Sequence, residues 1–350
     1  MLIDVNDESV EQFDLGSDSI VRPAGSALTM IAAQSDGARG LLVHGPSGVV
    51  VDTDAGGPVV GARYEFTDAK ATPSGRTVLV TDSGNFQSVL LSFDRGQPSY
   101  FPGLALALDD NRVVTTQNIG DAATISVFDH AGEPVTTGRT ASVRAGMITE
   151  VGIVLVTADG AIVNMDASSG TTTDGPQLSI GTIESGAVTT SGDRLVVTGS
   201  GGTAIVGADG DVIATVEGRS ATGSQQPPSG SACINTTSST ERAAAQLIVT
   251  DFSDGSVVAE AELEANSDAT LHTDASGCTI AASTSVGFDL IDADGVRRFD
   301  DGAVLALSLD GLVAAVERKG RIVLLATADA QPSNPIDLGL RGRAVHFTRS

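Results

Sequence analysis

The sequence contains no tryptophan, and aromatic residues make up only 3% of its 350 residues. Sugar-binding sites usually present aromatic stacking platforms, so this scarcity argues against a carbohydrate-binding role. No run approaches the ~18 apolar residues of a membrane span. The N-terminus has neither the basic start nor the apolar stretch of a signal peptide. Read literally, these absences favour a soluble chain.

Positive charge is also scarce, because the only lysines are Lys70 and Lys319. Lysine and arginine number 20 against 44 aspartates and glutamates, which gives a formal net charge of -24. Such a surface repels phosphate backbones and anionic headgroups, so we expect no nucleic-acid partner. The acidity is typical of a highly soluble protein. It also leaves open a cation site or a basic partner.

Cysteine is limited to Cys233 and Cys278, which lie 45 residues apart and each open an apolar strand of successive repeats. Two cysteines without CxxC spacing supply too few ligands for a metal site. A disulfide between neighbouring repeats is geometrically feasible and would stabilise the fold by about 4 kcal/mol. Two buried free thiols are the alternative. A disulfide would favour an exported protein.

What the sequence does contain is a repeat. An apolar strand stops at an aspartate and turns on a glycine near Asp94, and the same phrase returns at Asp129, Asp166 and Asp209. Weaker copies place the spacing at about 40 residues along the chain, the period of a four-stranded propeller blade. We therefore predict an all-β propeller of antiparallel four-stranded blades. Eight blades fit best, and seven or nine are alternatives.

The repeat makes residues 1–350 a single propeller domain, because each blade packs only on its neighbours. Residues 1–26 resemble an incomplete hairpin, and we expect them to close the ring with a strand in 341–350. Residues 219–242 interrupt the rhythm with a Ser/Thr/Gly/Pro-rich inserted loop. The chain begins in mid-blade, as a domain cut after an anchor would. We expect an extracytoplasmic, envelope location, with a cytoplasmic one as the alternative.

The strand-Asp-x-x-Gly-strand phrase, spread over nearly the whole chain, resembles the blade hairpin of quinoprotein-like, WD-repeat and YVTN-type β-propellers. Without tryptophan, the Trp-Asp ending of WD repeats and the tryptophan docking motifs of quinoproteins are missing, so neither family's cofactor or partner residues carry over. Blades rich in Ala, Gly and Asp are similar to extracytoplasmic propeller domains of actinobacterial envelope proteins. Some of those assist mycolate-lipid transport or polar growth.

Candidate catalytic chemistry is sparse. Sequences such as Asp209-Gly210-Asp211 resemble fragments of calcium loops, yet Asp-Gly is also what a tight hairpin turn selects. We expect turns, with no cofactor and a divalent cation as the alternative. His44 and His272 fall near inner strands and are candidates for a central channel. No catalytic triad, nucleophile elbow or phosphate-binding loop is present.

Two functional hypotheses remain. The first is a non-enzymatic, monomeric binding or scaffold propeller that holds a protein or lipid-like ligand at one face or in the central channel. The second is a cation-dependent hydrolase or lactonase-like propeller, which requires carboxylates from several blades converging on one tunnel. We prefer the binding propeller because no catalytic constellation is present in the sequence.

Overall fold

The computed structural model describes the residues of 2–4, 9–11, 13–14, 18–24, 30–36, 39–44, 49–52, 57–60, 66–72, 77–92, 95–188, 192–220, 233–238, 245–251, 253–263, 271–274, 276–284, 286–300, 302–308, 310–327, 335–337 and 346–349. Side chains are described for 70, 72, 77–91, 98–188, 192–218, 233–237, 245–251, 253–263, 271–274, 276–284, 286–300, 302–308, 310–327 and 335–337. All regular structure in these residues is β-strand. They include no helix that could cross a membrane.

The described strands form eight four-stranded antiparallel sheets and a ninth sheet that joins the two chain ends. From the N-terminus, the first sheet contains β5 (Met30–Asp36), β6 (Arg39–His44), β7 (Val49–Asp52) and β8 (Gly57–Val60), and the second contains β9 (Phe66–Ala71), β10 (Thr77–Asp82), β11 (Gln87–Ser92) and β12 (Arg95–Pro102). The third sheet contains β13 (Leu104–Leu108), β14 (Arg112–Ile119), β15 (Ala122–Asp129) and β16 (Pro134–Ala141). The fourth contains β17 (Val143–Ile148), β18 (Ile153–Thr157), β19 (Ala161–Met165) and β20 (Thr172–Gln177).

The fifth sheet contains β21 (Ile183–Val188), β22 (Arg194–Gly199), β23 (Gly202–Gly207) and β24 (Val212–Val216), and the sixth contains β25 (Arg219–Ser220), β26 (Cys233–Ser238), β27 (Ala245–Asp251) and β28 (Val257–Leu263). The seventh sheet contains β29 (Leu271–Thr273), β30 (Ile280–Ser283), β31 (Phe288–Asp292) and β32 (Gly295–Phe299). The eighth contains β33 (Ala303–Leu307), β34 (Val313–Arg318), β35 (Arg321–Ala326) and β36 (Ile336–Asp337). The predicted all-β class and the antiparallel four-stranded blades are confirmed.

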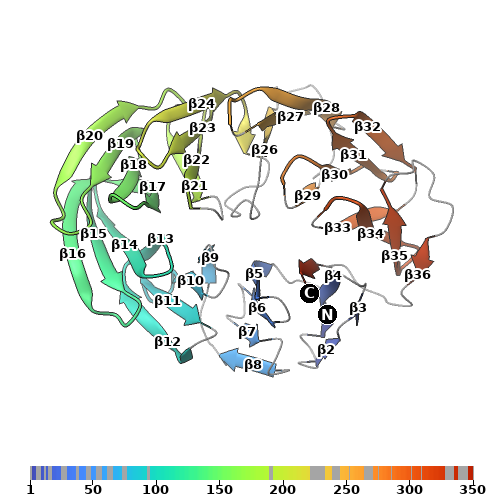
Figure 1. Cartoon of the computed structure of the whole chain (residues 1–350), viewed down its shortest axis with the longest axis horizontal. Helices are drawn as coiled ribbons and strands as arrows, with labels where there is room; N and C mark the ends of the chain where they lie inside the picture. The colour runs from blue at the N-terminus through green and yellow to red at the C-terminus, as the bar shows by residue number, and fades with distance from the viewer. Residues whose placement is uncertain are drawn as a thin grey trace.

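The sheets are arranged as the blades of a ring, with the first strand of each near the centre and the fourth on the periphery (Figure 1). The ninth sheet contains β1 (Leu2–Asp4), β2 (Ser9–Glu11), β3 (Phe13–Asp14), β4 (Asp18–Ala24) and the C-terminal β37 (His346–Arg349). Strand β37 pairs antiparallel with β4 and contacts both β33 and β5. The last strand of the chain therefore lies between the first and last four-stranded blades.

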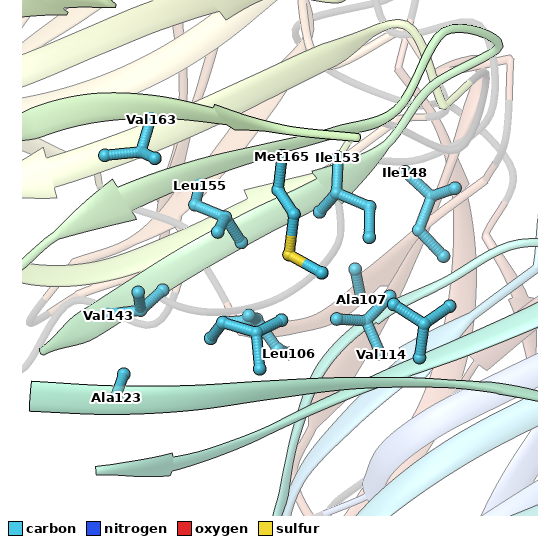
Figure 2. Packing of buried hydrophobic residues seen from close by; sticks show 12 residues of the cluster. Leu106, Ala107, Val114, Ala123, Val143, Ile148, Ile153, Leu155, Val163 and Met165 are labelled. Carbon is cyan, nitrogen blue, oxygen red and sulfur yellow. The ribbon is translucent and has the colours of Figure 1, made fainter. Parts of the chain in front are cut away.

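Apolar residues between neighbouring blades form the core. One cluster combines Leu106 and Val114 of the β13–β16 blade with Ile153, Leu155 and Met165 of the next blade (Figure 2). Every residue of β10 and β18 is buried, because the second strand of a blade is covered on both faces. Such strands appear in the sequence as continuous apolar runs instead of alternating patterns.

Alternating strand directions give the ring two distinct ends. The turns between first and second strands, and between third and fourth, lie at what we call the Asp-turn end. The turns between second and third strands lie at the opposite end, together with the connections from one blade to the next, and we call it the linker end. The described aspartate-glycine turns of the repeat, at Asp129, Asp166, Asp209, Asp251 and Asp292, fall at the Asp-turn end of their blades.

Candidate functional site

The Asp-turn end concentrates the acidic residues of the described chain. Its turns and adjoining strand ends contain Asp109, Asp110, Asp129, Glu133, Glu150, Asp166, Asp193, Asp209, Asp211, Asp251, Asp254, Asp274, Asp292, Asp294 and Asp310. Most of these side chains are exposed. This end of the ring is therefore strongly anionic.

Many of these aspartates fold their own turns. The Asp129 carboxylate accepts hydrogen bonds from the backbone N–H groups of Ala131 and Glu133, and Gly132 occupies positive φ in the same turn. In the next blade, the Ser168 hydroxyl at 2.6 Å and neighbouring N–H groups lower the pKa of Asp166 to about 2. Carboxylates that accept local hydrogen bonds favour their charged form. The turn around Asp166 therefore holds its carboxylate in the charged form.

The arginines placed at this end are already paired with aspartates. Arg112 lies 2.7 Å from Asp109, and Arg194 lies 3.4 Å from Asp193. Arg297 reaches back from β32 to Asp292. The exposed acids at this end outnumber these three pairs. The end therefore keeps a net negative charge, which attracts cations and basic partners.

The carboxylates do not gather around a common point in the described part of the chain. No group of three or more His, Cys, Asp or Glu side chains is placed there to hold a metal ion. Many of the aspartates instead accept hydrogen bonds from amides of their own turns, as Asp251 does from the Ser253 N–H. A bound divalent cation remains an untested alternative.

The linker end holds fewer acids and mixes them with cations. Its described acidic residues include Asp82, Asp121, Asp159, Glu184, Glu217, Glu262, Asp300 and Glu317, and Arg318, Lys319 and Arg321 lie among the turns of the β33–β36 blade. Backbone hydrogen bonds connect the blades here. The Ser142 N–H donates to Asp121 O at 2.9 Å, and the Ile183 N–H donates to Ala158 O at 3.1 Å. The first bond extends the β15–β16 ladder to the residue that leads into the next blade, and the second crosses from the β21–β24 blade to the β17–β20 blade.

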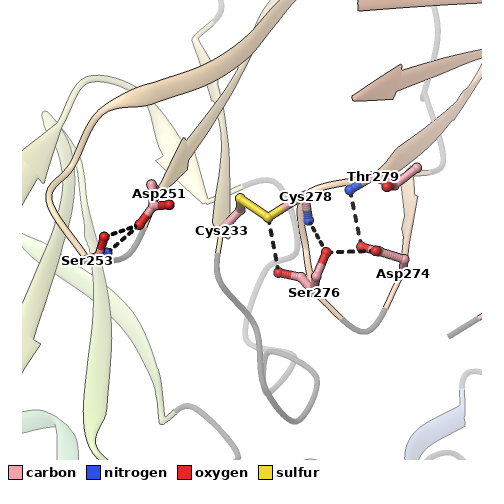
Figure 3. Close-up of a disulfide and its surroundings, with 7 residues drawn as sticks. All are labelled: Cys233, Asp251, Ser253, Asp274, Ser276, Cys278 and Thr279. Carbon is pink, nitrogen blue, oxygen red and sulfur yellow. Dashed lines mark hydrogen bonds between the residues drawn. A yellow bond between two sulfur atoms is a disulfide. The ribbon is translucent and has the colours of Figure 1, made fainter. Parts of the chain in front are cut away.

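Cys233 and Cys278 form a disulfide that joins two neighbouring blades at the Asp-turn end (Figure 3). Their Cα atoms lie 5.0 Å apart. The Cys233 N–H also donates to Ser276 O at 3.1 Å, and the Ser276 hydroxyl donates to the Asp274 carboxylate at 2.7 Å. The disulfide thus fixes the start of β26 to the turn between β29 and β30.

The two predicted histidines do not come together. His272 lies in the inner strand β29, half-buried, with a hydrogen bond to the backbone of Val304 on the neighbouring β33. Burial lowers the pKa of its imidazole to about 4, because desolvation disfavours the cation. His44 ends β6, and its side chain lies outside the described residues. A channel role for either histidine stays a prediction. Of the expected inserted loop at 219–242, residues 221–232 and 239–242 also lie outside the described residues.

The sequence analysis did not single out the exposed aliphatic residues on the outer strands. Val212, Val257 and Val296 each follow an Asp-Gly turn and are 36%, 53% and 47% exposed. At the linker end Phe86 is 53% exposed at a φ of 54°, beside the fully buried Asp82. The signal for the valines was present as an apolar residue just after each turn glycine, but exposure depends on strand register.

The ring of four-stranded antiparallel sheets defines the protein as a β-propeller. Solved structures with this fold include BamB from Moraxella catarrhalis, at 15% identity and a TM-score of 0.50, covering 86% of this chain and 95% of that one. The dihydro-heme d1 dehydrogenase NirN in complex with DHE matches at 14% identity and a TM-score of 0.54, over 92% of this chain and 77% of its own. No family model and no curated sequence matches. At these identities the likeness shows the fold alone.

Proposed function

We propose that this chain is a non-enzymatic binding propeller, the extracytoplasmic domain of a bacterial envelope protein, which holds a basic protein partner at its Asp-turn end. The observation that carries the proposal is the contrast between the two ends of the ring. Acids dominate one end, and the arginines there are already paired. Complementary charge steers association and selects partners more than it sets raw affinity.

The extracytoplasmic assignment is supported by the disulfide between Cys233 and Cys278. Disulfides persist in oxidising compartments and are rare in the cytosol. Trapping thiols with an alkylating reagent in intact cells tests the assignment. We expect both cysteines to resist alkylation until a reductant is added. Rapid alkylation in untreated cells would place the protein in a reducing compartment.

A protein partner is favoured over the lipid-like ligand of the first hypothesis, because anionic surfaces repel anionic headgroups. Native mass spectrometry of protein purified from its own host separates the two. A copurifying lipid would replace the protein partner with a carrier role in lipid transport. A stoichiometric divalent ion would favour the hydrolase alternative. NirN, a dehydrogenase of the same fold, shows that propellers also serve enzymes.

Site-specific photo-cross-linking in cells that make the protein tests the binding end. A photoreactive residue replaces Glu150 or Asp211 at the Asp-turn end, or Glu217 at the linker end. We expect a discrete cross-linked protein from the first two positions only. Neutralising Glu133, Glu150, Asp211 and Asp294 to their amides should abolish it. The same change at Asp121, Glu217 and Asp300 is the matched control, and equal loss in both variants contradicts the proposal.

A further inference from the structure

Three consecutive blades place an exposed valine at the same position of their outermost strand. Val212, Val257 and Val296 pair with Val206, Thr250 and Ile291, respectively. Each of those partners is the residue before the last of the third strand. The three valines, which we call the rim valines, therefore occupy one register position near the Asp-turn end of their strands. Strands β24, β28 and β32 lie on the periphery of the ring (Figure 1).

A single exposed valine needs no explanation, since apolar atoms contribute much of any protein surface. Repetition in one register on three successive blades is different, because the core gains nothing from it. In the preceding blade the same register position is Thr173, which pairs with Asn164 and is exposed. The apolar stripe thus begins at β24 and continues along β28 and β32. Contacts between β28 and β32 bring two of its strands together.

An exposed acid accompanies each rim valine. Asp211 directly precedes Val212, Asp294 lies two residues before Val296, and Asp254 lies three residues before Val257. The outermost strands are also the last in the strand order of their sheets, so their outer edges have no described partner strand. The periphery of these three blades therefore repeats one unit, an acid beside an aliphatic side chain on an open strand edge.

We infer that the rim valines are the apolar part of the docking surface for the protein partner proposed above, and that the partner contributes a segment with alternating basic and aliphatic side chains. This inference rests on the proposed function and names the chemistry of the partner. Its aliphatic groups cover the rim valines while its cations meet the neighbouring aspartates. A second copy of this chain is a poor occupant, because both copies carry a formal charge of -24.

Two synthetic peptides of equal length and charge test the inference, one alternating lysine with leucine and one alternating lysine with serine. Proline at intervals keeps both extended and monomeric. Binding to the full chain is measured by fluorescence anisotropy at physiological salt. We expect the leucine peptide to bind at least about tenfold more tightly than the serine peptide, since only its side chains cover the rim valines.

Changing all three rim valines to serine should abolish this preference while leaving the serine peptide unaffected. The matched control changes Ile119, Val151 and Val286, which are 77%, 83% and 64% exposed elsewhere, to serine and should keep the preference. Thr173→Val should extend the stripe and strengthen leucine-peptide binding roughly threefold. Thermal unfolding verifies that each variant is folded.

The outcomes separate this inference from the proposed function. If both peptides bind equally to the unchanged chain, or if the preference survives the triple substitution, the rim valines are not a docking surface. The proposed binding of a basic partner at the Asp-turn end is not affected by either result. If neither peptide binds, the proposed basic partner fails as well. Self-association that the triple substitution removes would make a second copy the occupant and would overturn the inference.

Discussion

The two ends of the ring are held together in different ways. At the linker end, the Ile183 N–H donates to Ala158 O across a blade boundary. At the Asp-turn end, the backbone bond from Cys233 N–H to Ser276 O is accompanied by the Arg112 guanidinium on Thr149 O and by the Cys233–Cys278 disulfide. Backbone bonds form with almost any residue, whereas side-chain bonds need particular ones. Side-chain bonds also cross at the linker end, where Asn118 bonds to the backbone of Val143, so what distinguishes the Asp-turn end is its covalent connection.

The largest expected effect comes from breaking the covalent connection at the Asp-turn end. Replacing Cys233 and Cys278 by serine should lower the free energy of unfolding by about 4 kcal/mol, because the bridge closes a loop of 45 residues in the unfolded chain. Urea unfolding of the double variant and of the reduced protein measures the loss. An unchanged midpoint in both would mean that hydrogen bonds and apolar packing join these two blades without help from the bridge.

The inner strand β29 and the Asp-turn end should lose stability in different pH ranges on acidification. His272 has a folded pKa of about 4 against 6.5, so the unfolded chain binds the extra proton first. Stability should fall as the pH drops from 6.5 to 4, by about 3 kcal/mol at most, and this contribution should level off below 4. Asp166 has a folded pKa of about 2 against 3.8 in the unfolded chain. Its carboxylate therefore contributes to stability above pH 3.8, and this contribution is lost as the pH falls toward 2.

His272→Gln tests the first pH range. The variant should lose less stability than the unchanged protein between pH 6.5 and 4, as followed by urea unfolding at several pH values. At pH 7 the histidine is neutral in both states, so the difference there measures packing alone. A parallel decline in both proteins would show that the buried imidazole does not cause the loss.

The sequence predicted the blades because the information in each Asp-x-x-Gly turn is local. Asp166 accepts hydrogen bonds from residues two and three positions onward, and Gly170 supplies the positive φ. Burial of His272 could not be predicted, since it depends on Val304 in another blade. The rim valines were missed for a similar reason. Whether Val257 is exposed depends on pairing with Thr250, which sequence spacing alone does not determine.

Two glycines of the β29–β32 blade, one at each end of the ring, should lose stability on substitution for different reasons. At the linker end, a Cβ on Gly287 would overlap the carbonyl oxygen of Phe299. Gly287→Ala should therefore lower the free energy of unfolding by about 2 kcal/mol through overpacking. At the Asp-turn end, Gly295 has open space around it but a φ of 116°. Gly295→Ala should cost about 1 kcal/mol from backbone strain alone. Equal losses would contradict the assigned causes.

The smallest expected difference concerns two aspartates with different surroundings. Asp82 is fully buried and accepts hydrogen bonds from the side-chain amides of Asn85 and Gln87 at 2.7 and 3.0 Å. Asp82→Ala leaves those donors without this acceptor and should lower the free energy of unfolding by about 1.5 kcal/mol. Asp166→Ala removes hydrogen bonds of an exposed turn, where water replaces the carboxylate, so its loss should be smaller.

Urea unfolding of both alanine variants at pH 7 provides the measurement, with Asp82→Asn as the control that keeps one acceptor oxygen. If Asp166→Ala proved the more damaging change, its turn would be required for blade stability beyond its local hydrogen bonds. The acids of the Asp-turn end would then be retained for folding, and the charge contrast between the two ends would lose its value as evidence for a partner. The expected order instead leaves most of that negative charge available for binding.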